Sequence, residues 1–386
     1  PLQYVNAEGT VSNSSYFNIQ DGVLISYSGS DINVEVPSEV TSIGRSAFSG
    51  NTTMISVTLP ESVVDIDAYA FSNCTALQNI HWSSSLQSIG DSAFAGCSSI
   101  TDLYLPGTLD TIGSAVFSRC NNLQNVYVPK SFPDPSGSFI TYGPFLYNDA
   151  DFTVIFEDGI TRIPNSLFES SAISEISIPN TVTEIGAKAF LSCENLTKVS
   201  LPENLQSIGS QAFNHCSSLE SVWIPKSLQN VEGGFGYGPF TNCPSLKYIN
   251  FQEGITDIPD NLFSGSDITE FVVPDTVTSI GNRSFYDCNQ LSKLVIPESV
   301  TSIGDEMVAL SENVTIYCME NSAAYLYAVQ NGIPYVIQGG ESGQETSTPI
   351  FHVVDAETME DISGAIISLT DGTNSYKLET TENGTG

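Results

Sequence analysis

Basic residues are scarce in this chain of 386 residues. Lysine and arginine together number 11, against 44 aspartates and glutamates, so the formal net charge is −33. Nucleic acids and anionic lipid surfaces are bound through cations, so the composition excludes a nucleic-acid binder and an electrostatic membrane binder. No run of about 18 apolar residues occurs, and we expect no membrane insertion. With no initiator methionine or signal peptide, and an end in mid-pattern, the chain reads as an excised or processed piece of a longer protein.

Patterns that accompany catalysis or cofactor binding are also missing. The three histidines fall in unrelated positions, at His81, His215 and His352, and no H-E-x-x-H or G-x-S-x-G motif occurs. There is no P-loop, no G-x-G-x-x-G, no C-x-x-C and no EF-hand spacing. We therefore predict a non-enzymatic protein without cofactor or metal. Calcium bound by acidic loops is the minor alternative to a plain solvated acidic surface.

A repeat of about 23 residues runs through most of the chain. A twelfth, degenerate unit has Val308 at the position that phenylalanine marks in the other units: Phe48, Phe71, Phe94, Phe117, Phe145, Phe168, Phe190, Phe213, Phe240, Phe263 and Phe285. In each unit, apolar residues two apart predict a short strand with one buried face. A proline ends the strand, and an Ile-Gly pair then turns the chain. One unit cannot bury its own apolar face, so we expect about 12 coils to stack into a β-rich repeat solenoid with a parallel sheet.

The consensus of these units is Leu-x-x-Ile-x-Leu-Pro-x-x-Val-x-x-Ile-Gly-x-x-Ala-Phe-x-x-Cys. It resembles the BspA-type bacterial leucine-rich repeat over about residues 23–337. The resemblance implies a right-handed leucine-rich-repeat coil, a secreted or bacterial cell-surface location, and adhesion to a host protein or carbohydrate. Where the ordinary leucine-rich repeat has an asparagine after the strand, mostly hydroxyl residues stand here and are expected to satisfy the backbone: Ser62, Ser85, Thr108, Asn204, Ser227 and Ser299.

The domain boundaries follow from where the repeat begins and ends. We expect an N-terminal cap at 1–37, the solenoid at 38–318, a C-terminal cap at 319–338, a linker at 339–349 and a partial β-sandwich at 350–386. A solenoid end needs a cap because it would otherwise expose a sheet edge.

The C-terminal region carries more detailed signals. Asn321 is expected to cap a short helix over 323–330, which Asn331-Gly332 ends, and 333–337 to form a last strand. Beyond the linker, strands predicted at 350–354 and 365–369 resemble the start of a CnaB-type or carboxypeptidase-regulatory-like β-sandwich. The strands expected later in that domain are absent.

A block of four units is duplicated. The steps from Phe117 to Phe145 and from Phe213 to Phe240 are 28 and 27 residues long instead of about 23. Both insertions begin Pro-Lys-Ser and end Tyr-Gly-Pro-Phe, and both are followed by Gly-Ile-Thr-x-Ile-Pro. We therefore expect two equivalent loops on the same side of the rod, about 20 Å apart.

Seven of the eight cysteines form a column of their own. They stand three residues after the repeat phenylalanine: Cys74, Cys97, Cys120, Cys193, Cys216, Cys243 and Cys288. Stacked Cβ atoms would be about 4.8 Å apart, whereas a disulfide needs roughly 3.8 Å. We predict buried free thiols that act as small apolar spacers, with Cys318 in the core outside the column.

The strand residues that face outward provide the candidate binding surface. They suggest one patch of His81, Tyr104 and Tyr127 and another of Trp223 and Tyr248. Exposed tyrosine and tryptophan are typical of binding hot spots and of surfaces that stack on sugars. The alternative is that aromatic residues simply favour strands. With the loop tyrosines added, the candidate residues are His81, Tyr104, Tyr127, Trp223, Tyr248, Tyr142 and Tyr237.

Three hypotheses for the function follow. The first is a monomeric surface binding protein that contacts an unidentified extracellular host protein or carbohydrate through the strand face and the two loops. The second is a rigid spacer that holds a downstream domain away from the cell wall. The third is an accessory module of a larger secreted enzyme.

Overall fold

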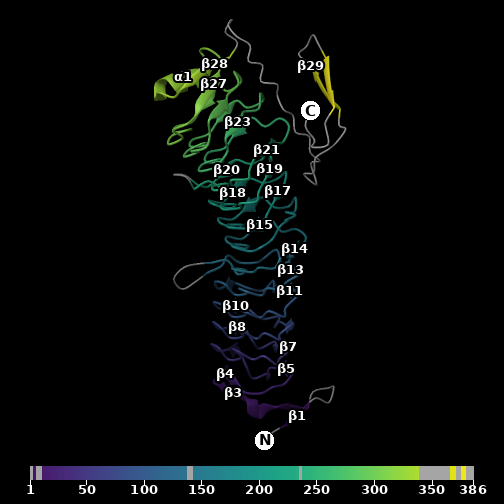
Figure 1. The fold of residues 1–386 in the computed structure, drawn as a ribbon. Coiled ribbons are helices and arrows are strands. Elements are labelled where there is room, and N and C mark those ends of the chain that lie inside the picture. Colours follow the sequence, from purple (N-terminus) through teal and green to yellow (C-terminus); the bar gives the residue numbers. More distant parts are fainter. Residues whose placement is uncertain are drawn as a thin grey trace.

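In the computed structural model, the chain forms an elongated solenoid of about 13 turns (Figure 1). The structure describes residues 3–5, 11–136, 142–233, 237–338, 366–370 and 375–379. Most coils have two strands, which lie on different sides of the rod. We call these sides the long-strand face and the short-strand face.

The long-strand face is built from parallel strands of three or four residues. They pair at equivalent repeat positions, as Val57 of one coil pairs with Ile80 of the next. The hydrogen-bonded groups are β5-β7-β9, β11-β13-β14, β17-β19-β21 and β23-β25-β27-β28. The strands are β5 (Asn33–Glu35), β7 (Ser56–Thr58), β9 (Asn79–His81), β11 (Asp102–Tyr104), β13 (Asn125–Val128), β14 (Thr153–Phe156), β17 (Lys198–Ser200), β19 (Ser221–Ile224), β21 (Tyr248–Phe251), β23 (Glu270–Val272), β25 (Lys293–Val295), β27 (Thr315–Cys318) and β28 (Tyr335–Ile337).

The short-strand face is a second parallel ladder, where the sequence predicted only a turn. Each strand after β4 has two residues, the second usually isoleucine, whose side chain enters the core. The groups are β4-β6-β8-β10-β12, β15-β16-β18-β20 and β22-β24-β26. The strands are β4 (Val23–Tyr27), β6 (Ser42–Ile43), β8 (Asp65–Ile66), β10 (Ser88–Ile89), β12 (Thr111–Ile112), β15 (Arg162–Ile163), β16 (Glu184–Ile185), β18 (Ser207–Ile208), β20 (Asn230–Val231), β22 (Asp257–Ile258), β24 (Ser279–Ile280) and β26 (Ser302–Ile303).

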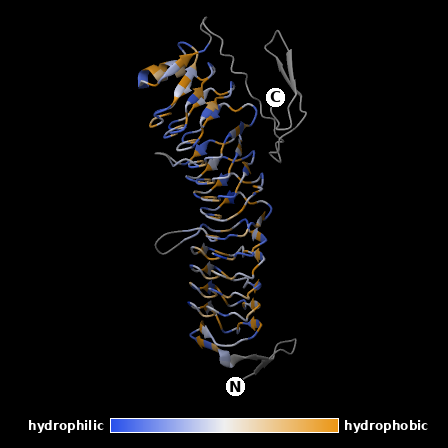
Figure 2. Cartoon of the chain, in the orientation of Figure 1, coloured by the Kyte–Doolittle hydropathy of each residue, from blue (hydrophilic) through white to orange (hydrophobic). Residues whose placement is uncertain are grey.

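The repeat phenylalanines form the centre of a continuous core. All eleven are buried, and Val308 is buried at the twelfth position, as the sequence predicted. From Phe48 to Phe240, and from Phe263 to Phe285, successive rings stack with centroids 4.7 to 5.8 Å apart and planes within 27° of each other. Hydrophobic residues recur at the same place in each coil, so they form stripes along the rod (Figure 2). This arrangement confirms the prediction of stacked coils with a shared interior.

The turn around each phenylalanine depends on left-handed backbone. Residues two before and two after the ring repeatedly have positive φ, as at Ala115 (55°) and Arg119 (58°) on either side of Phe117. Most of these residues are not glycine, so they adopt a conformation that costs an L-residue about 1 kcal/mol or more. Repeated stacking contacts on either side hold the turn in this shape.

The cysteine column is buried and free of disulfides, as predicted. The thiols, however, are more than apolar spacers. Each Sγ donates to the carbonyl of the phenylalanine one coil earlier, as Cys74 does to Phe48 at 3.2 Å. Where the column lacks cysteine, other small donors occupy it: Asn148 Nδ2 bonds the Phe117 carbonyl at 2.9 Å and Ser311 Oγ the Phe285 carbonyl at 2.7 Å.

The predicted hydroxyl column also bonds the backbone of the preceding coil in most units. Ser62 Oγ donates to the Val40 carbonyl at 2.6 Å, and Ser227 Oγ to the Leu205 carbonyl at 2.6 Å. Asn204 does the same with its side-chain amide, which bonds the Asn180 carbonyl at 3.1 Å. Ser299 is an exception, because its buried Oγ has no hydrogen-bond partner among the described residues.

The N-terminal end of the solenoid is covered by antiparallel strands that the sequence pattern did not reveal. β3 (Phe17–Gln20) pairs antiparallel with β4, and β1 (Gln3–Val5) pairs antiparallel with β2 (Val11–Asn13), followed by a 3-10 turn η1 (Ser14–Tyr16). Because β3 runs against its neighbour, it closes the edge of the parallel short-strand ladder.

At the other end, helix α1 (Ala323–Asn331) and β28 follow the last repeat, as expected. The predicted N-cap is wrong by one residue. Ser322, not Asn321, caps the helix, and its Oγ accepts the Tyr325 N–H at 3.2 Å. Asn321 instead adopts a left-handed backbone with φ 63°. Gly332 ends the helix with φ 66°, as predicted.

Of the predicted sandwich, the structure describes one antiparallel hairpin. It consists of β29 (Ile366–Thr370) and β30 (Ser375–Glu379), which pair in regular register. The strand predicted at 350–354 and the linker lie outside the described residues. The hairpin alone does not define a sandwich.

Candidate binding surfaces

The strongest candidate on the long-strand face is a pair of stacked tyrosines. Tyr104 of β11 and Tyr127 of β13 are paired across the ladder, and their ring centroids lie 4.0 Å apart with planes within 7°. Tyr104 is 58% exposed. Ile155 of β14 pairs with Tyr127 and continues the same outward column. We call Tyr104, Tyr127 and Ile155 the tyrosine patch.

A polar pair borders the tyrosine patch in the neighbouring outward column. Asn125 Nδ2 donates to Asp102 Oδ1 at 2.7 Å, so both side chains are held in one orientation. The hydrogen bond that the Tyr127 hydroxyl makes to Tyr104 and, to a smaller extent, desolvation raise the pKa of Tyr127. The surface thus combines rigid aromatic area with fixed polar groups, an arrangement suited to binding proteins or sugars.

Trp82 supports the tyrosine patch and was missed by the sequence analysis. It stands where most repeats have a buried aliphatic residue, and its ring meets Phe94 edge-on at 5.3 Å. Its Nε1–H donates to the Tyr104 carbonyl at 2.7 Å. In the preceding coil, the equivalent carbonyl belongs to His81, and it accepts the backbone N–H of Leu59. The irregular Trp82-Ser83 pair, where other units have an aliphatic residue and proline, was the available signal.

The structure divides the predicted aromatic patches. His81 is exposed on β9, but β9 and β11 belong to separate hydrogen-bonded groups, so the ladder is interrupted between His81 and Tyr104. On the other predicted patch, Tyr248 pairs with Ser221, two residues before Trp223. Trp223 is half-buried and Tyr248 is 39% exposed, so this pair lies diagonally across two strands.

The loop tyrosines lie away from the tyrosine patch. The first insertion is anchored on the short-strand side, where Ser136 N–H bonds the Ile112 carbonyl at 2.7 Å and Tyr142 N–H bonds Ser114 Oγ at 3.1 Å. Tyr237, its counterpart, is 57% exposed, and its carbonyl accepts from Ser210 Oγ at 3.0 Å. The structure therefore does not join the loop tyrosines and the strand tyrosines into one surface.

Each insertion interrupts the short-strand ladder, and the first interruption is closed by an ion-pair network. Arg162 of β15 binds Asp134 through two nitrogens at 2.7 and 2.9 Å, and its Nε bonds Glu184 Oε1 at 2.7 Å. Asp134 also accepts the Asn165 N–H at 2.7 Å. Side chains thus span the gap between the inserted segment and β15.

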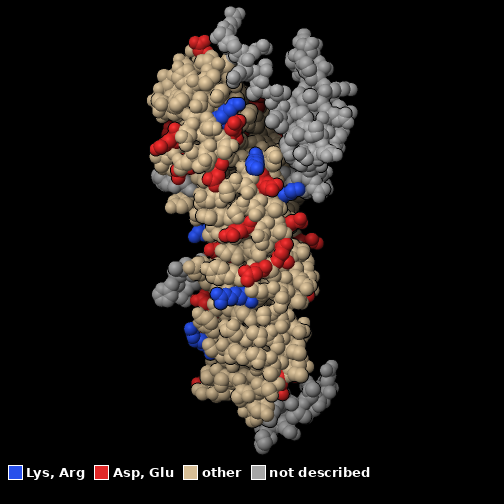
Figure 3. Space-filling model, viewed as in Figure 1, with Lys and Arg blue, Asp and Glu red and all other residues tan. Residues whose placement is uncertain are grey.

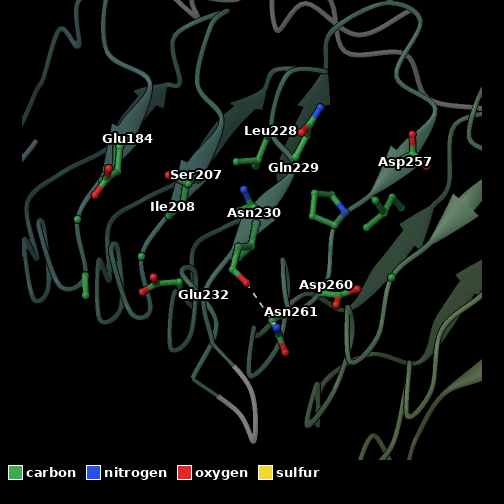
Figure 4. Close-up of a pocket in the computed structure, with 18 of the residues that line it drawn as sticks. Glu184, Ser207, Ile208, Leu228, Gln229, Asn230, Glu232, Asp257, Asp260 and Asn261 are labelled. Atoms are coloured by element: carbon green, nitrogen blue, oxygen red, sulfur yellow. Dashed lines mark hydrogen bonds between the residues drawn. The ribbon is translucent and has the colours of Figure 1, made fainter. Parts of the chain in front are cut away.

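The second interruption is open. β20 and β22 are the end strands of separate groups, and a groove of about 1210 Å³ lies between and beside them. Duplication places Asn230 and Asp257 where the first loop has Asp134 and Arg162, so the bridging ion pair is absent. Figure 4 shows Asn230 and Glu232 on one side, with one bond crossing, from Asn261 Nδ2 to the Val231 carbonyl at 3.5 Å. The sequence analysis missed this groove, although comparing the duplicated blocks could have found it.

Acidic side chains dominate the charged surface around the middle and C-terminal coils in the view of Figure 3. Among the described residues, no group of three or more His, Cys, Asp or Glu side chains could hold a metal ion. In the same residues, no helix has both the length and the apolar character needed to cross a membrane.

Comparisons with known proteins show what this arrangement resembles. The family described as BspA type leucine-rich repeat region matches at residues 25–139, 144–235 and 234–328. No curated protein sequence matches. A leucine-rich repeat protein from Bacteroides ovatus is 20% identical, with 83% of this chain and 97% of that chain covered and a TM-score of 0.46.

Two further solved structures are similar to this chain at low identity. A leucine-rich cell-surface protein from Faecalibacterium prausnitzii is 24% identical, with 85% of this chain and 97% of that chain covered and a TM-score of 0.39. The pneumococcal vaccine antigen PcpA is 19% identical, with 83% and 95% covered and a TM-score of 0.38. Because the family match extends over most of the solenoid, the chain belongs to the BspA-type leucine-rich repeat family.

Proposed function

We propose that this chain is a non-enzymatic binding protein of the bacterial cell surface and that the tyrosine patch contacts its target, an extracellular host protein or carbohydrate. The observation that carries the proposal is the stacked pair of Tyr104 and Tyr127. Two rings held face to face on adjacent strands lose little conformational entropy on binding, and they present a flat amphipathic surface.

The elements around the pair support this assignment. Trp82 holds the Tyr104 carbonyl, and Asp102 and Asn125 hold each other beside the rings. A surface with this degree of preorganisation spends little free energy on ordering side chains when a ligand arrives. The family, and two similar structures that are described as a cell-surface protein and a vaccine antigen, agree with a surface location.

The test is a binding screen with a matched control. The chain is applied to an array of mammalian glycans and extracellular-matrix proteins, and every positive signal is measured again with Tyr104→Ala/Tyr127→Ala. We expect at least a tenfold loss of affinity. The control is Tyr69→Ala, which removes another exposed tyrosine that lies under Arg45 in a phenylalanine turn. Equal affinity of the wild type and the double variant would refute the role of the tyrosine patch.

A rigid spacer is the second candidate. The observation that favours it is the stack of phenylalanine rings, which ties each coil to the next. A spacer predicts no ligand on the array. It also predicts that insertion of one more coil changes the reach of a downstream domain without changing any affinity.

A further inference from the structure

We propose that the groove between β20 and β22 is a second binding site and that its ligand is an extended peptide segment with basic side chains. We call it the short-strand groove. It lies on a different face from the tyrosine patch, and its assignment does not depend on the proposed function above. The interrupted ladder, the charge of the lining and the contrast between the two duplicated loops support the assignment.

The interrupted ladder leaves two strand edges facing the groove. Among the described residues, β20 pairs only with β18, and β22 only with β24. Most units have a glycine after the short strand, and its N–H bonds the preceding coil, as Gly281 N–H bonds the Ile258 carbonyl at 2.8 Å. After β22 this position is Pro259, which has no N–H to donate. An extended peptide can supply backbone donors and acceptors to such edges by strand addition. Two residues per edge give few bonds, so the side chains must contribute the rest of the affinity.

The side chains that line the groove favour a cationic ligand. Glu232, Asp257 and Asp260 are exposed, and none of them forms an ion pair with another described residue. Two described cations line the groove, Arg162 and Lys226. Arg162 is neutralised by Asp134 and Glu184, whereas Lys226 forms no ion pair with another described residue. Carboxylates at the mouth of a groove attract lysine and arginine side chains and orient them.

The composition of the lining speaks against a sugar. None of the described residues that line the groove is aromatic. Flat apolar sugar faces are usually bound by stacking on aromatic rings, and the described lining supplies none. Its floor consists instead of buried Leu228, Val231 and Ile258 with the strand edges beside them.

The duplicated loop provides an internal comparison. At the first interruption, Asp134, Arg162 and Glu184 occupy the gap with their own ion pairs. At the second, the equivalent positions hold Asn230, Asp257 and Ser279, which pairs with Asp257, so the Asp–Arg–Glu arrangement of the first loop is not repeated. We infer that a basic side chain of the ligand takes the place that Arg162 has in the first loop.

The experiment closes the groove by copying the first loop. Asn230→Asp/Asp257→Arg recreates the Asp–Arg pair and raises the net charge by one. The control, Asp110→Asn, also raises it by one, at an exposed position just before β12 on the same face. The probe is a fluorescent octapeptide of alternating lysine and threonine, compared with a glutamate–threonine octapeptide and with chitohexaose.

We expect saturable binding of the lysine peptide, at least tenfold weaker in Asn230→Asp/Asp257→Arg. Affinity should be unchanged in Asp110→Asn and in Tyr104→Ala/Tyr127→Ala, which separates this site from the tyrosine patch. Methylation of alternate backbone nitrogens in the peptide should also weaken binding, because it removes donors for the strand edges. If the closing variant does not fold, Glu232→Gln/Asp257→Asn removes two carboxylates of the lining with little change in side-chain size and should weaken binding at least fivefold.

Three outcomes would overturn the proposal. The first is no saturable binding of the lysine peptide, or binding no tighter than that of the glutamate peptide. The second is the same affinity in the wild type and in the folded closing variant. The third is binding of chitohexaose that the closing variant abolishes while the lysine peptide does not bind, which would assign the groove to a carbohydrate.

Discussion

At the scale of single residues, the position three residues after each core phenylalanine usually holds a small side chain with a hydrogen that can be donated. Cysteine, serine and asparagine all occur there, and thiol, hydroxyl and amide alike donate to a phenylalanine carbonyl one coil away. A buried carbonyl without a partner would cost about 1–3 kcal/mol. The thiol therefore combines packing with satisfaction of the backbone, a role that spacing in the sequence could not reveal.

The thiols make stability depend on alkaline pH. Burial raises the pKa values of Cys120, Cys193, Cys243 and Cys288 to about 12 from 9.0. Since the unfolded chain ionises first, their contribution is complete below pH 9 and is lost between pH 9 and 12. Each thiol should lower the free energy of unfolding by about 1.4 kcal/mol per pH unit in that range.

The measurement is urea unfolding at pH 8, 9 and 10 for the wild type and for a variant with serine at these four positions. Serine keeps the donor, as Ser311 does in the same column. We expect the wild type to lose more stability than the variant between pH 9 and 10, while lysine and tyrosine ionisation affects both. Parallel pH profiles would show that the thiols do not ionise on unfolding in this range.

At the scale of elements, the insertions matter because they interrupt one ladder and leave the other intact. β13 still pairs with β14, and β19 with β21, across the two insertions on the long-strand face. On the short-strand face, the first gap depends on Arg162. Its guanidinium is held by Asp134 and Glu184, and only 34% of its side chain is exposed.

Replacing Arg162 by alanine should therefore destabilise the first insertion. Asp134 and Glu184 would be left near each other without a cation. Asp134 would keep its hydrogen bond from the Asn165 N–H but would lose the guanidinium. We expect a loss of about 1–3 kcal/mol in the free energy of unfolding. Lys130→Ala, which removes a more exposed ion pair with Glu157, should cost less than about 0.5 kcal/mol. Equal effects of the two substitutions in urea unfolding would contradict this account.

Prediction of elements from the sequence succeeded where a signal recurred in every coil. The long strands and the phenylalanine core follow from apolar spacing repeated along the chain. The short strands were read as turns because two residues are too few to show alternation. The N-cap was misplaced because Asn321 and Ser322 are both good N-cap residues, and the left-handed backbone at Asn321 decides between them.

The candidate sites were predictable to different degrees. Tyr104 and Tyr127 were placed together because register in a parallel stack follows the repeat. His81 does not join these tyrosines because the ladder is interrupted at the coil that contains Trp82. The repeat consensus gives no sign of this interruption. The short-strand groove arises because the first copy of the duplicated block has Arg162 where the second copy has Asp257. The repeat consensus does not contain this difference, so the consensus could not predict the groove.

At the scale of the whole molecule, stability should be a sum over coils and their neighbours. Deletion of residues 67–89 joins Ile66 to Gly90 and removes one complete period, so every column stays in register. We expect a folded protein that unfolds cooperatively, with a melting temperature a few degrees lower. Deletion of residues 67–78 removes half a coil and should abolish the cooperative transition in circular dichroism. A loss of folding in both variants would contradict a solenoid held together by nearest neighbours.

The eight buried thiols also set a condition on how such a protein can be produced. Once folded, the thiols are buried, so an oxidising environment leaves them unchanged. An unfolded chain in that environment exposes all of them to oxidants and to one another, and mispaired disulfides would block the stacking of coils. For a chain secreted in an unfolded form, coil formation therefore competes with thiol oxidation. A reductant present during refolding would slow oxidation and so increase the yield of native protein.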